Sequence, residues 1–116
     1  MNNVMIIKGH RAVITFDPEI NLFRGEFTEL NGHVDFYGDS LAALKAESEK
    51  SLAVFMDLCR ENKLEPVKKF SGTLNFRTNK KIHALASTLA TARGISLNKF
   101  IEEALIQQID AEMLIQ

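Results

Sequence analysis

Residues 70–78 constrain this chain most, because they alternate apolar and polar side chains over a run too short to fold by itself. Successive side chains of a strand point to opposite faces. The apolar face would hold Gly72, Leu74 and Phe76, and the polar face Ser71, Thr73, Asn75 and Arg77. A single short strand is not stable in water. The pattern therefore predicts that this strand pairs with one from a partner.

Two amphipathic helices are predicted directly after that strand. Within residues 79–93, with Thr78 as the expected cap, apolar side chains recur at intervals of three and four. Gly94 then suits a left-handed residue that ends a helix. Ser96 is the expected N-cap of the second helix. The apolar stripe of that helix is Leu97, Phe100, Ile101, Ala104, Leu105 and Ile109.

Charge is distributed unevenly along the sequence. Residues 1–66 contain seven basic and eleven acidic side chains, whereas residues 67–99 contain seven basic and no acidic ones. A solvated surface is one interpretation of such a segment. Next to an outward Thr-Asn-Arg face, an electrostatic attraction to nucleic acid is the better one.

The order strand, helix, Gly-Ile-Ser-Leu-Asn turn and helix resembles the ribbon-helix-helix family of DNA-binding proteins. In that family two chains pair their strands into a ribbon that enters the major groove. The resemblance implies base reading by Thr73, Asn75 and Arg77. Phosphate contacts are expected from Lys80, Lys81, Ser96, Leu97 and Asn98. The expected dimer core is Leu74, Phe76, Ile82, Leu85, Leu89, Leu97, Phe100, Ile101 and Leu105.

The first half of the chain has strand patterns. Residues 11–17, 22–30 and 34–37 predict a three-stranded antiparallel meander, preceded by a short apolar run at residues 4–7. A turn is expected over residues 17–21, where Pro18 presets the dihedral angle. Asn31-Gly32 between two strand patterns predicts a tight hairpin.

One long helix follows these strands. Asp39-Ser40 provides an N-cap, and the helix is expected over residues 41–62. Its buried stripe would be Leu41, Leu44, Ser48, Leu52, Phe55 and Cys59. The predicted fold class is α+β: a three-stranded sheet with one long helix, then a dimerising strand-helix-helix module. The predicted domains are residues 1–65 and 70–116, joined by a linker at residues 66–69.

Several short segments together resemble the HicB antitoxin family. They are Lys8-Gly9, the turn at residues 17–19, Phe23 to Glu26, Gly38 to Ser40, Pro66, residues 70–72 and residues 94–98. The resemblance implies a degraded RNase H-like domain that binds a HicA-type toxin, an RNase that cleaves messenger RNA. It also implies that the C-terminal module represses the operon by binding operator DNA as a homodimer, with higher oligomers left open.

Catalysis is not expected. Turn and cap roles already account for Asp17 and Asp39. The three histidines lack metal-ligand spacing, and the six glycines form no phosphate loop. We therefore expect no cofactor, no metal and no small-molecule substrate. The alternative function is a stand-alone repressor whose N-terminal domain binds a small ligand or only oligomerises.

Cytoplasmic localisation is expected from two further features. The single cysteine, Cys59, excludes an intramolecular disulfide framework. No apolar run is long enough for a membrane span, and residues 4–7 are too short for the core of a signal peptide.

Overall fold

The computed structural model describes residues 3–113, which form two compact units. We call residues 3–71 the first unit and residues 72–113 the second unit. The predicted domain ranges 1–65 and 70–116 also include residues 1–2 and 114–116, which lie outside the described residues. Each unit is considered separately below.

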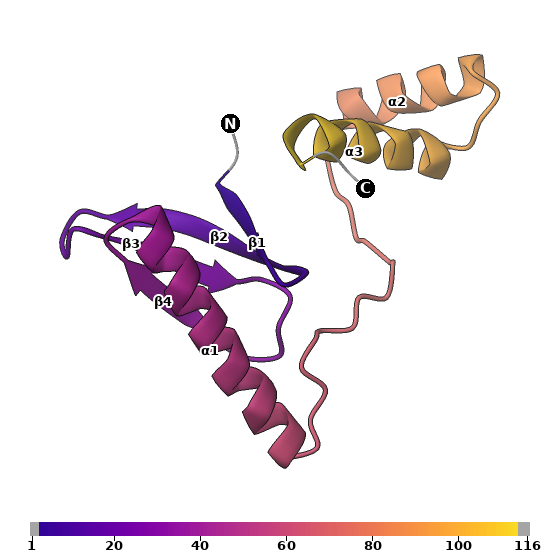
Figure 1. Ribbon diagram of the computed structural model, residues 1–116. Helices are drawn as coiled ribbons and strands as arrows, with labels where there is room; N and C mark the ends of the chain where they lie inside the picture. Colours follow the sequence, from indigo (N-terminus) through magenta and orange to yellow (C-terminus); the bar gives the residue numbers. More distant parts are fainter. Residues whose placement is uncertain (1–2, 114–116) are drawn as a thin grey trace. The chain divides into compact units, whose positions relative to one another are not determined.

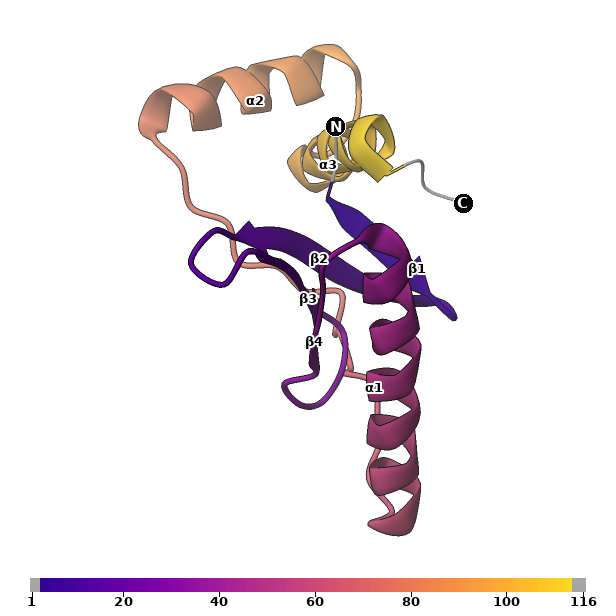
Figure 2. The same ribbon diagram turned by 60° about the vertical axis from the view of Figure 1, so that its left-hand side comes forward.

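An antiparallel sheet forms one layer of the first unit, with its strands in the order of the chain (Figure 1). The strands are β1 Val4–Ile7, β2 His10–Asp17, β3 Leu22–Phe27 and β4 Asp35–Gly38. Helix α1, Leu41–Glu61, lies along one face of this sheet (Figure 2). The described part of this unit is thus a two-layer α+β fold, as expected for its class.

The sheet has four strands, so the prediction of three was wrong. Val4–Ile7 is a strand of its own, and Ile7 pairs with His10 across a two-residue loop. Both loop residues, Lys8 and Gly9, have positive φ angles, of 49° and 83°. Such a loop matches the twist of an antiparallel hairpin. Lysine is an uncommon residue at a left-handed position, so the sequence Lys8-Gly9 did not indicate this turn.

The predicted tight hairpin at Asn31-Gly32 was also wrong, although β3 and β4 do pair antiparallel. Strand β3 ends at Phe27 and β4 begins at Asp35, so a loop of residues 28–34 joins them. The Phe27 amide donates to the Val34 carbonyl at 3.1 Å and closes the base of this loop. Asn31 instead bonds to the segment after α1, a contact distant in sequence.

Helix α1 packs through small and aliphatic side chains. Its N-cap is Ser40, whose hydroxyl accepts from the Ala43 amide at 3.1 Å, as predicted. Of the predicted stripe, Phe55 is half-buried and Leu41 is exposed, so Leu41 was assigned wrongly. The buried members are Leu44, Ser48, Leu52 and Cys59.

Glycine allows α1 to start close to β4. A Cβ atom at Gly38 would lie 2.6 Å from the Leu44 backbone nitrogen, nearer than real contacts allow. On β3, Gly25 faces Phe36 of β4 in the same way, and the Phe36 ring occupies the space that a side chain would need. The core around these contacts is Ile7, Ala12, Phe27, Leu30, Val34, Phe36, Leu44 and Leu52.

Two helices make up most of the second unit. Helix α2 is Lys80–Ala92 and helix α3 is Leu97–Met113. The N-cap of α2 is Asn79, whose Oδ1 accepts from the Ile82 amide at 2.8 Å, and not the expected Thr78. Gly94 has a φ of 70° after α2, as predicted.

Residues 70–78 are not assigned to a strand in this single chain. The predicted ribbon needs a second chain to supply its hydrogen-bonding partner, and the structure contains one chain. The predicted strand-helix-helix module is therefore observed as two helices that follow a segment without regular structure. None of the helices in residues 3–113 is long and apolar enough to cross a membrane.

Candidate functional site

The second unit carries a groove that we call the α2–α3 groove, with a volume of about 420 Å³. It combines side chains from the segment before α2 with side chains from both helices. The lining residues are Leu74, Phe76, Arg77, Thr78, Ile82, His83, Ala86, Leu97 and Ile101. Five of the nine predicted dimer-core residues are therefore brought together here: Leu74, Phe76, Ile82, Leu97 and Ile101.

Large apolar side chains of the second unit are exposed. Leu74 is 76% exposed and Phe76 is 67% exposed. About half of the surface of Ile82, Leu85 and Leu89 on α2 is also accessible. Among residues 72–113, only Ala90 is buried. An exposed apolar surface of this kind marks an interaction site.

The remaining predicted core residues lie along the helices. Phe100 is half-buried and Leu105 is exposed, and both belong to α3. Together with Leu85 and Leu89 they are not among the residues that line the α2–α3 groove. The apolar surface thus extends beyond the groove along both helices.

The three predicted base-reading residues are exposed. Thr73, Asn75 and Arg77 all belong to the segment before α2. Arg77 also lines the α2–α3 groove beside Leu74 and Phe76, although the alternation of a strand would place it on the opposite face. In a segment without strand pairing, strict alternation is not imposed.

The predicted phosphate contacts gather at two helix N-termini. Lys80 and Lys81 are exposed in the first turn of α2. At the start of α3, the Ser96 hydroxyl accepts from the Lys99 amide at 3.0 Å, which confirms the predicted cap. The first amides of a helix have no partner within the helix, and the helix dipole makes this end positive. Both ends are therefore chemically suited to an anion.

The positive charge of the second unit is smaller than the sequence pattern suggested. Lys68 and Lys69 belong to the first unit, so residues 72–113 contain five basic and four acidic side chains. All four acidic residues lie on α3, where Glu103 pairs with Arg93 at 2.8 Å and Glu102 with Lys99 at 3.2 Å. The basic surface is thus confined to the residues from Arg77 to Lys99.

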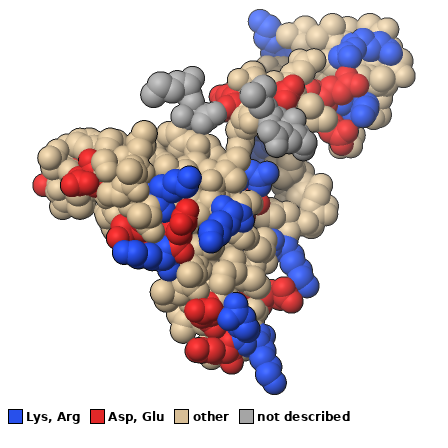
Figure 3. Space-filling model, viewed as in Figure 1, with Lys and Arg blue, Asp and Glu red and all other residues tan. Residues whose placement is uncertain are grey.

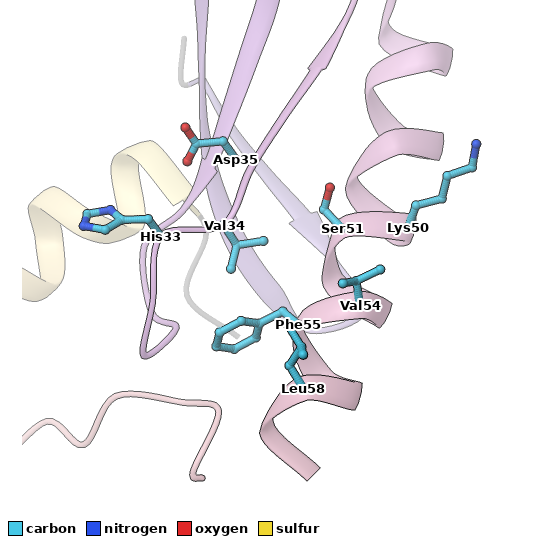
Figure 4. A pocket seen from close by; sticks show the side chains of 8 residues that line it. All are labelled: His33, Val34, Asp35, Lys50, Ser51, Val54, Phe55 and Leu58. Carbon is cyan, nitrogen blue, oxygen red and sulfur yellow. The ribbon is translucent and has the colours of Figure 1, made fainter. Parts of the chain in front are cut away.

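The first unit carries a second groove, which we call the β4–α1 groove, of about 350 Å³. One wall comes from the loop before β4 and the other from α1. Its lining residues are His33, Val34, Asp35, Lys50, Ser51, Val54, Phe55 and Leu58 (Figure 4). In Figure 4, Val34 points toward α1 and Lys50 points away from the loop. Because more than half of Val54 and of Leu58 is exposed, the α1 wall of this groove is apolar and accessible.

An ion-pair network lies on the face of β3 and β4 that points away from the core. The guanidinium of Arg24 donates to Asp35 Oδ2 at 2.6 Å and 3.2 Å and to Glu26 Oε2 at 3.3 Å. The hydrogen bond to Asp35 raises the pKa of the Arg24 guanidinium above its ordinary value, and a hydrogen bond to Tyr37 adds a smaller increase. Asp35 Oδ1 is buried and has no hydrogen-bond partner among residues 3–113. The sequence did not indicate this network, although Arg24 and Glu26, two positions apart, share one face of β3.

Charged side chains of both signs are scattered over the visible face of the first unit (Figure 3). With Lys68 and Lys69 included, this unit has nine basic and eleven acidic residues. Lysine and arginine side chains lie beside acidic ones on this face, so it carries no extended patch of one sign. Within residues 3–113, no three His, Cys, Asp or Glu side chains gather as a metal site would require.

Comparison with known proteins gives one family. The model of the HicB family matches residues 55–105, which run from the second half of α1 to the middle of α3. No curated protein and no solved structure matches the chain.

Proposed function

The match over residues 55–105 supports membership of the HicB family, and from this premise we propose that the chain is the antitoxin of a toxin–antitoxin pair. In this proposal it binds a HicA-type toxin directly and silences it. It also represses its own operon as a dimer bound to operator DNA. Catalysis plays no part in either activity.

The exposed apolar surface of the second unit is the observation that best supports the proposal that the chain binds DNA as a dimer. A second copy of the chain can cover this surface by two-fold symmetry, since such an interface uses the same patch on both chains. Pairing of residues 70–78 with their counterpart would satisfy backbone groups and bury Leu74 and Phe76. The expected result is a two-stranded ribbon resting on four helices.

The polar side chains of that ribbon would then read DNA. A two-stranded ribbon fits the major groove, where asparagine pairs with adenine and arginine with guanine. Asn75 and Arg77 are exposed and of the right chemistry. Lys80, Lys81 and the first amides of α3 would contact phosphates and so position the ribbon without reading sequence.

The toxin is proposed to bind at the β4–α1 groove of the first unit. Val54 and Leu58 on α1 offer an apolar anchor, since more than half of each side chain is exposed. Net charge contributes little, because the first unit has nearly equal numbers of acidic and basic residues. Burial of apolar surface is therefore the expected source of affinity.

Co-expression with a cognate HicA-type toxin tests this assignment. Leu58→Asp places a charge in the groove, and its matched control is Leu64→Asp, since Leu64 is similarly exposed and does not line the groove. We expect wild type and Leu64→Asp to restore growth and Leu58→Asp to fail while remaining folded. Equal rescue by all three would exclude this groove as the toxin site.

A stand-alone repressor whose first unit binds a small ligand or only oligomerises is the second candidate. The open, largely apolar β4–α1 groove is the feature that would serve it. Operator binding by a chain whose gene has no short basic reading frame beside it would favour this function.

A further inference from the structure

The segment that leaves α1 is hydrogen-bonded to the loop between β3 and β4. The Asn31 amide donates to the Pro66 carbonyl at 2.8 Å, and the Lys68 amide donates to the Glu29 carbonyl at 2.8 Å. Between these bonds, Leu30 and Val67 form an antiparallel bridge. We call residues 65–68 the strap, because this short ladder fastens them to the first unit.

The side chain of Asn31 adds two further bonds to the strap. Its Nδ2 donates to the Glu65 carbonyl at 2.8 Å and to the Val67 carbonyl at 3.1 Å. One residue thus contacts three consecutive strap carbonyls, two through its side chain and one through its backbone. An alanine here would keep the backbone bond and lose the other two.

The loop that holds the strap is itself fixed from inside the unit. Leu30 and Val34 are buried in the core on either side of Asn31. A Cβ atom at Gly32 would lie 2.9 Å from Phe55 Cε1, so the ring of Phe55 packs directly against the Gly32 backbone. Phe55 and Val34 also line the β4–α1 groove.

We propose that the strap is a conformational device: Asn31 holds residues 65–68, and the packing of Phe55 on Gly32 keeps the loop in its holding conformation. The tether to the second unit then begins after Lys68 and not at the end of α1. Because Phe55 also lines the β4–α1 groove, the state of that groove and the start of the tether are coupled through residues 30–34. This inference goes beyond antitoxin activity and requires no toxin or DNA.

Native-state hydrogen exchange on the full chain tests whether Asn31 holds the strap. The readout is the amide of Lys68, with amides of β2 and β3 as an internal reference for global unfolding. We expect Asn31→Ala to accelerate exchange at Lys68 roughly thirtyfold, as for the loss of two hydrogen bonds of ordinary strength. Unchanged exchange at Lys68, or equal acceleration of the sheet amides, would overturn a strap that Asn31 holds.

A second pair of variants tests the coupling to Phe55. Gly32→Ala touches no strap atom, yet its Cβ collides with the Phe55 ring, so exchange at Lys68 should accelerate. Adding Phe55→Leu relieves the collision and should return the exchange rate toward that of wild type. If Gly32→Ala leaves Lys68 unchanged, or if Phe55→Leu gives no recovery, the packing of Phe55 does not control the strap.

Discussion

At the scale of single residues, the surroundings of Asn75 and Arg77 in one chain do not account for either side chain. Both are exposed, and asparagine would be disfavoured in the strand of the proposed ribbon, so the ribbon itself does not explain Asn75. DNA recognition supplies an explanation, because each of these side chains can bond to a base edge through two atoms.

Substitution of these residues separates base reading from phosphate binding. Asn75→Ala or Arg77→Ala should reduce the preference for operator over scrambled DNA by about 1–3 kcal/mol. Lys81→Ala should weaken binding to both duplexes alike and lower the salt slope by about one. Binding isotherms at several salt concentrations measure both effects. An unchanged preference in both strand variants would contradict the assignment of base reading to residues 70–78.

Substitution can also test whether Asn79, and not Thr78, is the N-cap of α2. Asn79→Ala removes the side chain that accepts from the Ile82 amide and should lower the free energy of unfolding by about 1 kcal/mol. Thr78→Ala is the matched control and should change it much less. Urea denaturation at one fixed protein concentration compares the two. A larger loss for Thr78→Ala would show that Thr78 is the cap.

At the scale of elements, the helices and the turn at residues 17–21 could be predicted closely, whereas the turns at Lys8-Gly9 and Asn31-Gly32 could not. Ser40, Gly94 and Ser96 marked helix ends through local chemistry, and each serves as expected. The turn at Lys8-Gly9 was missed, because lysine rarely takes a left-handed conformation. The hairpin prediction at Asn31-Gly32 was wrong because the side chain of Asn31 bonds to the strap. The strap lies thirty-four residues or more away in sequence.

Close packing between β4 and α1 gives a further prediction for these elements. Gly38→Ala places a Cβ atom against the Leu44 backbone, where no flexible side chain can move aside. We expect the free energy of unfolding to fall by roughly 1–3 kcal/mol, the usual cost of overpacking. Chemical denaturation measures this loss, and a variant as stable as wild type would show that α1 can shift away from the strand.

At the scale of the whole molecule, the predicted sites depend on assembly. The α2–α3 groove brings together Leu74, Ile82 and Leu97, which local periodicity had placed on the apolar faces of three separate elements. The ribbon itself could not form within one chain, since its hydrogen bonds belong to a pair of strands. The Arg24–Asp35 network and the β4–α1 groove depend on contacts between elements, which sequence periodicity does not specify.

Light scattering of the purified chain across the micromolar range tests most directly the claim that a second copy covers the apolar face of the second unit. We predict twice the mass of one chain for wild type and for Ile20→Asp, a control at an exposed apolar residue of the first unit. Phe76→Asp should give the mass of a single chain, because it places a charge in the proposed interface. A wild-type chain that stays monomeric and folded throughout this range would contradict the account.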